Sequence, residues 1–143
     1  MNNGSFDGGQ LSAQERALRE YYINVMQISA THPAMMGEYQ SLHASNIDAA
    51  SAYDDKTFAF TRWTGDQQLV VVSQFTQEPK AFTLHVPAET VSAWQLASKT
   101  LNAIDLLTGQ SFPVVSKDDG SLAIEVAIDV LGSLVLELNA NEE

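Results

Sequence analysis

From residue 56 onward, apolar side chains recur at every second position. The segments TFAFTRW, AFTLHV, LAIEVAI and GSLVLEL all alternate in this way, and LVVVSQF is rich in β-branched residues. A period of two places the apolar side chains on one face of an extended strand. Turn-forming segments such as TGDQ and KDDGS interrupt the pattern about every ten residues. The spacing predicts about seven or eight short strands in an antiparallel sandwich or barrel.

The alternation also predicts which side chains form the core. LVVVSQF is apolar on both faces and is expected to be a central strand, whereas GEYQSLHA is expected to be an edge strand. SAWQLA and AIDLLTG are shorter strand candidates. We expect the following side chains to point inward: Phe82, Leu84 and Val86, then Leu122, Ile124, Val126 and Ile128, then Leu134, Leu136 and Leu138. The phenylalanines Phe58, Phe60, Phe75 and Phe82 are all assigned to the core, with Thr57, Thr61 and Trp63 on the opposite face of their strand.

One helix is predicted before the strands. Ser12-Ala13-Gln14-Glu15 fits the capping box that opens a helix. His32 precedes Pro33, which disfavours the helical conformation there, so the helix should end near Ala30 or Thr31. Its apolar stripe contains Leu18, Tyr21, Tyr22, Val25 and Met26. A single amphipathic helix must bury such a stripe against a larger body.

Composition narrows the classes of partner and site. The 143 residues carry a net charge of −11, which disfavours nucleic acids and anionic membrane surfaces. The chain has no cysteine, so disulfides and thiolate sites are excluded. No apolar run approaches the roughly 20 residues of a membrane-spanning helix, and no signal peptide is visible at the N-terminus. The sequence leaves the localisation undefined.

The ordered set of segments resembles a known family. FDGGQLSAQERALREYY, HPAMMGEY, YDDKTFAFTRW, LVVVSQF, AIDLLTGQSF and GSLVLEL together are similar to the C-terminal end of the α-amylase family of glycoside hydrolases. The resemblance implies that residues 1–36 are a loop and the last helix of a (β/α)8 barrel. It also implies that residues 37–143 are the all-β, Greek-key C-terminal domain. The glycine-rich opening loop would then be the connection that follows the eighth barrel strand.

The resemblance implies no catalytic residue on this chain. The catalytic carboxylates of the family lie at the ends of earlier barrel strands, and no segment here matches their motifs. Asp7 resembles a loop residue near the active-site face, although a turn aspartate that caps its own backbone is the simpler interpretation. Asp54/Asp55 and Asp118/Asp119 lie in expected turns. We therefore expect no catalytic residue and no cofactor.

Other chemistries have no motif in the sequence. His32, His43 and His85 are not paired at a zinc-binding spacing, and no EF-hand loop, phosphate-binding loop or nucleophile elbow is present. A calcium site built from irregular loop carbonyls stays open. No metal site is predicted.

Carbohydrate binding needs exposed aromatic rings with polar groups beside them. The candidates are Trp63, Trp94, Tyr39 and Tyr53. Trp63 adjoins the expected turn Thr64-Gly65-Asp66, which favours exposure of its ring, whereas the side on which Trp94 lies is undecided.

The sequence leaves three possible functions for this chain. The first is a non-catalytic accessory domain that packs on and stabilises a catalytic barrel through the Leu18/Tyr22/Val25/Met26 face of the helix, with a homodimer through this face as the other partner. The second is an α-glucan (starch or malto-oligosaccharide) binding module, which predicts a line of exposed aromatic rings on one sheet face. The third is a free-standing enzyme, for which the sequence shows no motif.

Overall fold

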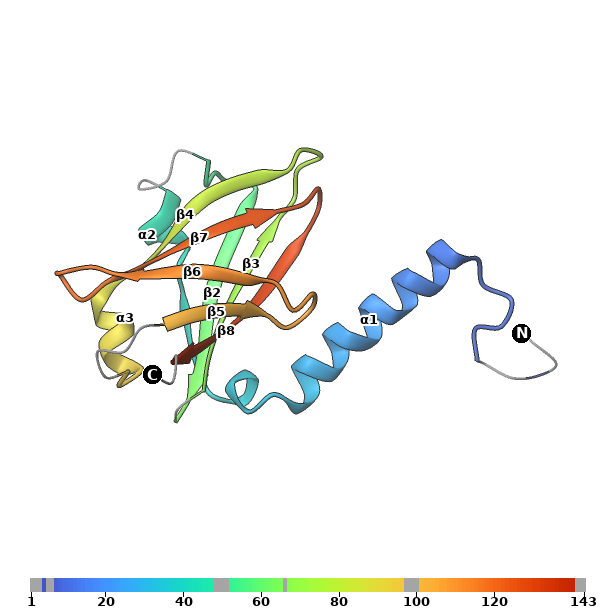
Figure 1. Cartoon of the computed structure of the whole chain (residues 1–143), viewed down its shortest axis with the longest axis horizontal. Coiled ribbons are helices and arrows are strands. Elements are labelled where there is room, and N and C mark those ends of the chain that lie inside the picture. The colour runs from blue at the N-terminus through green and yellow to red at the C-terminus, as the bar shows by residue number, and fades with distance from the viewer. Residues whose placement is uncertain (1–3, 5–6, 48–51, 66, 97–100, 141–143) are drawn as a thin grey trace. The chain divides into compact units, whose positions relative to one another are not determined.

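The computed structural model describes residue 4 and residues 7–47, 52–65, 67–96 and 101–140 (Figure 1). The chain divides into two compact units, Met1–His32 and Pro33–Glu143. The described part of the first unit is a loop and one long helix, and every described strand lies in the second unit.

The first unit contains the predicted helix, α1, which spans Ala13–Thr31. The capping box is complete, because the Glu15 amide donates to Ser12 Oγ at 3.3 Å and the Ser12 amide donates to Glu15 Oε2 at 2.9 Å. The helix ends at the predicted place, since His32 before Pro33 is extended at φ −73° and ψ 121°. Within the described part of its own unit the helix buries none of its side chains, so the apolar stripe around Leu18 and Tyr22 is exposed there.

The second unit is one antiparallel sheet. Its strands, in chain order, are β1 Glu38–Ser41, β2 Thr57–Thr64, β3 Gln67–Gln74, β4 Lys80–Val86, β5 Leu101–Asp105, β6 Ser111–Ser116, β7 Leu122–Ile128 and β8 Ser133–Ala140. Their spatial order is β1-β2-β3-β8-β5-β6-β7-β4. The order 8-5-6-7 within it is a Greek key, which confirms the predicted fold class.

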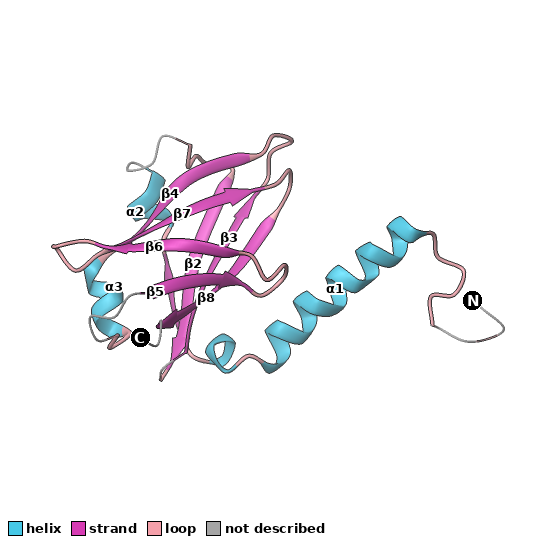
Figure 2. Ribbon diagram, in the orientation of Figure 1, coloured by secondary structure: helices cyan, strands magenta, loops and turns pink. Residues whose placement is uncertain are grey.

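The sheet curls so that its two halves pack face to face. Figure 2 shows β4, β7 and β6 crossing in front of β2, β3 and β8. The sequence predicted a sandwich, and the structure adds that its layers are continuous through the pairing of β5 with β6 and of β6 with β7. Among the described strands, β1 and β4 are the two at the edges of the sheet.

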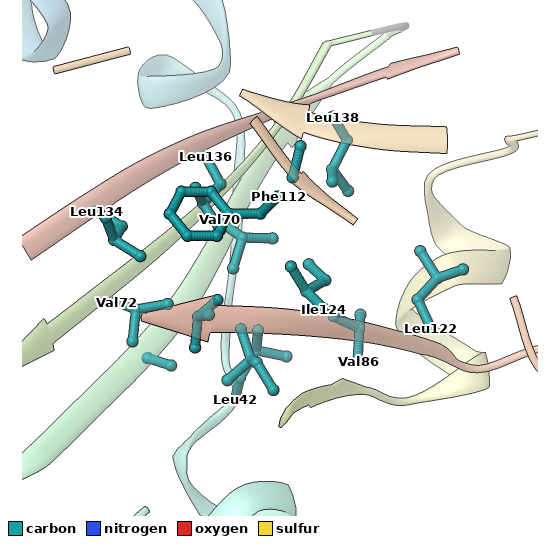
Figure 3. Packing of buried hydrophobic residues seen from close by; sticks show 14 of the residues in the cluster. Leu42, Val70, Val72, Val86, Phe112, Leu122, Ile124, Leu134, Leu136 and Leu138 are labelled. Atoms are coloured by element: carbon teal, nitrogen blue, oxygen red, sulfur yellow. The ribbon is translucent and has the colours of Figure 1, made fainter. Parts of the chain in front are cut away.

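The core lies between these halves and contains the side chains that alternation predicted. Figure 3 shows Leu134, Leu136 and Leu138 of β8 packed with Phe112 and Ile124. The predicted inward faces of β4, β7 and β8 are all buried. The predicted central strand β3 is flanked by β2 and β8, and its Leu69 to Val72 run is buried on both faces.

The predicted orientation of the β2 side chains was wrong, because the face expected to point outward points into the core. Phe58 is 40% exposed and Phe60 half-buried, whereas Thr57, Ala59 and Thr61 are buried. The pairing explains the inward face, since Ala59 lies opposite Val72 and Thr61 opposite Val70. The Thr61 hydroxyl is satisfied in the core because it donates to the Leu69 carbonyl at 2.7 Å.

Among the other predicted core phenylalanines, Phe82 is buried and Phe75 is 65% exposed. Phe75 lies immediately after β3, on the same parity as the outward-facing Ser73. The core assignment of Phe75 was therefore also wrong.

Three short helices of the second unit are described: η1 Pro33–Met36, α2 His43–Ile47 and α3 Ala88–Ala93. The strand predicted for SAWQLA was wrong for residues 92–96, which belong to the end of α3 and the turn after it, whereas Ala97 lies outside the described part. Pro87 occupies the N-cap at φ −60°, and the helical spacing of Thr90 and Trp94 buries one side of the turn. The turn at Thr64-Gly65 connects β2 to β3 as predicted, whereas Asp66 and residues 48–51 lie outside the described part.

Polar side chains link the two edge strands. Asn46 on α2, just after β1, donates Nδ2 to the His85 carbonyl at 2.8 Å and accepts from the His85 amide at 2.7 Å. It thereby completes the pairing of the β4 backbone, and Figure 1 shows α2 beside β4. Thr90 after β4 donates to Gln40 of β1 at 3.0 Å. The short helices that follow the two edge strands, α2 after β1 and α3 after β4, thus link one edge of the sheet to the other.

Replacing Asn46 with alanine should destabilise the β unit by about 2–3 kcal/mol, since both backbone groups of His85 lose their partner. Urea denaturation followed by far-UV circular dichroism measures this change. The matched control is Ser45→Ala, which loses one hydrogen bond to the Leu42 carbonyl at 3.0 Å and a long one from Asn46 Nδ2 at 3.4 Å but leaves both bonds to His85 in place, and it should cost about 1 kcal/mol or less. Equal effects of the two substitutions would contradict a special role for Asn46.

A second link should respond to pH. Lys80 of β4 donates to Asp54 Oδ1 at 2.6 Å, and this hydrogen bond lowers the pKa of Asp54 from its ordinary 3.8. Because the folded pKa is the lower one, the stabilisation is present above the ordinary pKa and is lost as the pH falls through the folded pKa. The difference in Tm between wild type and Asp54→Asn should therefore be greatest near neutral pH and vanish in acid. Asp55→Asn is the control, and a difference that persists in acid would exclude this linkage.

Candidate functional site

The structure separates the four aromatic candidates for carbohydrate binding. Trp94 and Tyr53 are 1% and 2% exposed and belong to the core, so neither offers a ring face at the surface. Burial raises the pKa of the Tyr53 phenol, whose oxygen lies 3.1 Å from His43 Nδ1. Trp63 is half-buried against the core, and Tyr39 is 52% exposed. A surface role in sugar binding stays a prediction for Trp63 and Tyr39.

The outward phenylalanines of β2 form a row with their neighbours. Ring centroids lie 5.6 Å apart for Tyr39 and Phe60, 6.0 Å for Phe60 and Phe58, and 5.9 Å for Phe58 and His43. We call these four residues the outer aromatic row. Sequence reasoning missed it because large apolar residues were assigned to the core. The available signal was the small size of the residues at the alternate positions, Thr57, Ala59 and Thr61. Small side chains fit the inward face of β2, because the rings of other segments already fill the core there.

A pocket of about 230 Å³ lies where the start of β1 meets the end of β2. The described residues that line it come from three segments: Gly37 and Glu38, then Trp63, Thr64 and Gly65, then Ala93 and Gln95. We call it the Trp63 pocket. It contains one of the four predicted aromatic candidates, together with a carboxylate, a hydroxyl and an amide side chain.

Backbone geometry fixes the walls of the Trp63 pocket. A Cβ atom at residue 37 would lie 1.9 Å from the Trp63 carbonyl oxygen, so only glycine allows β1 to begin at this distance from β2. The Gly37 carbonyl in turn accepts from Arg62 Nη2 at 2.9 Å. Gln95 follows α3 with φ +55°, a left-handed conformation that is uncommon outside glycine and asparagine.

Three carboxylates of the described residues have structural partners that clearly lower their pKa: Glu15 through Ser12, Asp54 through Lys80 and Asp119 through the Ser121 hydroxyl. A lowered pKa keeps a carboxylate ionised, whereas the general acid of a glycosidase needs a raised one. Asp119 accepts from the Ser121 amide at 2.9 Å, in the turn that the sequence predicted.

Asp7, the one aspartate that resembles a residue near an active-site face, lies in a turn. Asp7 Oδ1 accepts from the Gly9 amide at 2.9 Å, the geometry of a turn aspartate. Within residue 4 and the ranges 7–47, 52–65, 67–96 and 101–140, no three histidine, cysteine, aspartate or glutamate side chains come together as a metal site. Nor does any helix there combine the length and apolar character that crossing a bilayer requires.

Comparison with known proteins identifies the fold. No family model and no curated protein matches the sequence. Among solved structures, AmyP in complex with maltotriose matches with a TM-score of 0.62 and 17% identity over 93% of this chain and 23% of the AmyP chain. The α-amylase from Geobacillus thermoleovorans, complexed with acarbose, gives 0.60 and 14% over 87% and 23%. An α-amylase from Anoxybacillus gives 0.59 and 15% over 89% and 23%.

The matched regions are small parts of the other proteins. The chain spans less than a quarter of the length of these three solved structures. The likeness to α-amylase structures that the sequence indicated is thus confirmed for the fold: nearly the whole chain is folded like a segment of known α-amylases.

Proposed function

We propose that this chain is the non-catalytic C-terminal region of an α-amylase-type glycoside hydrolase. In this proposal the β unit is an accessory domain that packs on and stabilises a catalytic (β/α)8 barrel. The observation that carries the proposal is the match of about nine-tenths of this chain to under a quarter of each α-amylase. In this proposal the catalytic barrel, and with it the catalytic carboxylates, lies in the remaining three-quarters of such a protein.

The helix supports a barrel partner. α1 has a complete capping box and an apolar stripe, yet it buries none of its side chains. Most of the stability of such a helix in a protein comes from packing of its apolar face. In the proposal α1 is the last barrel helix, and the stripe of Leu18, Tyr22, Val25 and Met26 packs on the barrel.

The carboxylates are consistent with an accessory role. Glycoside hydrolysis uses two carboxyl groups about 5–9 Å apart across the scissile bond, one of them protonated. The shifted carboxylates of this chain have pKa values moved in the opposite direction by serine and lysine partners. They stabilise a helix start and two turns of the fold.

The first test is direct. The purified chain should release no reducing sugar from starch and no p-nitrophenol from p-nitrophenyl maltosides above the buffer rate. A known α-amylase added to the same samples is the positive control. Turnover that rises with the concentration of the chain and co-purifies with it would refute the non-catalytic role.

The second test concerns the stripe. In the triple variant Leu18→Gln, Tyr22→Gln, Met26→Gln, binding of the apolar dye ANS should fall, because the exposed patch is removed. The Tm of the β unit should change by about 1 °C or less, because in the proposal the stripe packs on a barrel and not on the β unit. The matched control replaces three residues of the polar face, Arg16→Gln, Glu20→Gln, Asn24→Gln, and should leave ANS binding unchanged.

Two results would contradict the barrel as occupant of the stripe. A fall in Tm of several degrees in the triple variant would mean that the stripe stabilises the β unit of the same chain. A dimer of the wild type in sedimentation equilibrium, lost in the triple variant and kept in the polar-face control, would assign the stripe to a second copy.

A further inference from the structure

Four large apolar residues are exposed where the far end of β3 meets the turn between β7 and β8: Phe58, Phe75, Val130 and Leu131. We call these four residues the turn patch. We infer that two copies of this chain associate through the turn patch as a two-fold dimer. This association goes beyond the proposed accessory role and uses a surface other than the stripe of α1.

Backbone hydrogen bonds join the three segments that carry the turn patch. Phe58 lies on β2, and two residues before it the Lys56 carbonyl accepts from the Phe75 amide at 2.9 Å. The next carbonyl along the chain, that of Thr76, accepts from the Leu131 amide at 3.0 Å. The segment after β3 therefore lies between the start of β2 on one side and the β7–β8 turn on the other.

The buried side chain of Gln74 fixes the two loops relative to each other. Its Nε2 donates to the Glu78 carbonyl at 3.0 Å and to the Asp129 carbonyl, while its Oε1 accepts from the Thr76 amide at 2.9 Å. The Gln74 amide also donates to the Gly132 carbonyl at 3.0 Å. The turn patch is thus pre-formed, so little conformational freedom is lost when a partner binds to it.

The backbone at Leu131 indicates that its side chain serves a contact outside the fold. Leu131 has φ +51°, a left-handed conformation that is unfavourable for a bulky residue and that glycine adopts at lower cost. The side chain is 62% exposed, so burial in the core does not offset this cost. Backbone strain of this kind is concentrated at functional sites.

The surface beside the turn patch is also suited to a protein contact. Ser73 and Ser133, on the same outer face, share a hydrogen bond of 2.8 Å between their hydroxyls, so both hydroxyls keep a partner when water is removed. The opposite outer face is more polar, since Thr83 of β4 donates to the exposed carboxylate of Glu125 at 2.6 Å. Dehydration therefore costs less on the face that carries the turn patch.

The charges that border the turn patch favour a second copy as its partner. Lys56 lies on the β2 side and Asp129 lies in the turn on the other side, and both residues are exposed. A two-fold axis through the patch exchanges its two sides, so that Lys56 of each copy faces Asp129 of the other. Opposite charges that meet across an interface favour that arrangement over others.

The contact proposed for the barrel involves other residues. The helix η1, which follows α1 in the chain, leads to Gly37, and Gly37 contacts the Trp63 carbonyl near the end of β2. The turn patch lies beyond the opposite end of this strand, which begins at Thr57. The accessory role and the dimer can therefore be tested separately.

The first measurement is sedimentation equilibrium of the full chain between about 5 and 500 µM. We expect a monomer–dimer equilibrium with a Kd on the order of 10–100 µM, as is typical of a small interface. The α1 variant Leu18→Gln, Tyr22→Gln, Met26→Gln should dimerise with the same Kd, because the stripe lies outside the turn patch.

Two variants of the turn patch should weaken the dimer. Leu131→Gly and Phe75→Thr should each raise the Kd by about tenfold or more, because each removes an apolar side chain from the interface. Glycine suits the left-handed backbone at residue 131, so an unchanged or higher Tm should show that Leu131→Gly is folded. The matched control is Val115→Thr, which alters a residue of β6 that is similarly exposed and should leave the Kd unchanged.

A charge exchange tests the two-fold arrangement. Lys56→Glu and Asp129→Lys should each weaken the homodimer, because each places like charges opposite each other. An equimolar mixture of the two variants should dimerise again, since both contacts of the mixed dimer then join opposite charges.

Each other outcome overturns the inference. A chain that stays monomeric at about 500 µM, well above the expected Kd, refutes the dimer. A dimer that is lost in the α1 variant but kept in Leu131→Gly and Phe75→Thr belongs to the stripe. Failure of the mixed charge variants to associate refutes the two-fold pairing of Lys56 with Asp129. The first and third outcomes leave the accessory role standing, because that role is tested by hydrolysis and by the α1 variants.

Discussion

The β unit depends on how its curled sheet is held at the two edges. An open eight-stranded sheet has two rows of unpaired backbone groups, and these groups must be covered. Here Asn46 fills the role of a missing strand beside His85, and Thr90 reaches Gln40 of the opposite edge. Because these bridges connect the first strand to the fourth, they also hold the two layers over the core. Side chains thus link the two ends of the strand order at these points.

The alternation in sequence predicted most of this architecture because the core faces of β4, β7 and β8 consist of large aliphatic residues at every second position. It failed where small residues face inward. In β2 the core already contains the rings of Tyr53 and Trp94, so Ala59 and two threonines fit and the phenylalanines face outward. It failed at α3 because Trp94 at the end of a six-residue helix resembles an apolar strand residue when only its neighbours are considered.

The candidate pocket could be predicted only in part. The sequence singled out Trp63 and the turn beside it, since an aromatic ring next to a glycine turn is a local signal. Gly37 and Gln95 carry no such signal, because they meet Trp63 only through the pairing of β1 with β2 and the packing of α3. The sequence did not predict β6, because Pro113 lies within it opposite Asn102 and proline normally argues against an inner strand.

The outward orientation of the β2 phenylalanines affects which substitutions this domain tolerates. Most β proteins are damaged when a large strand residue is made smaller. In this strand the vulnerable positions are the small ones, since a bulkier group at Ala59, which is fully buried, has to displace neighbours in a close-packed interior. Phe58 and Phe60 lie on the outer face, where a smaller side chain leaves no cavity in the core. Diversity at these two sites among natural variants would therefore report on what touches the outside of the domain, and constancy there would reveal a contact that folding does not require.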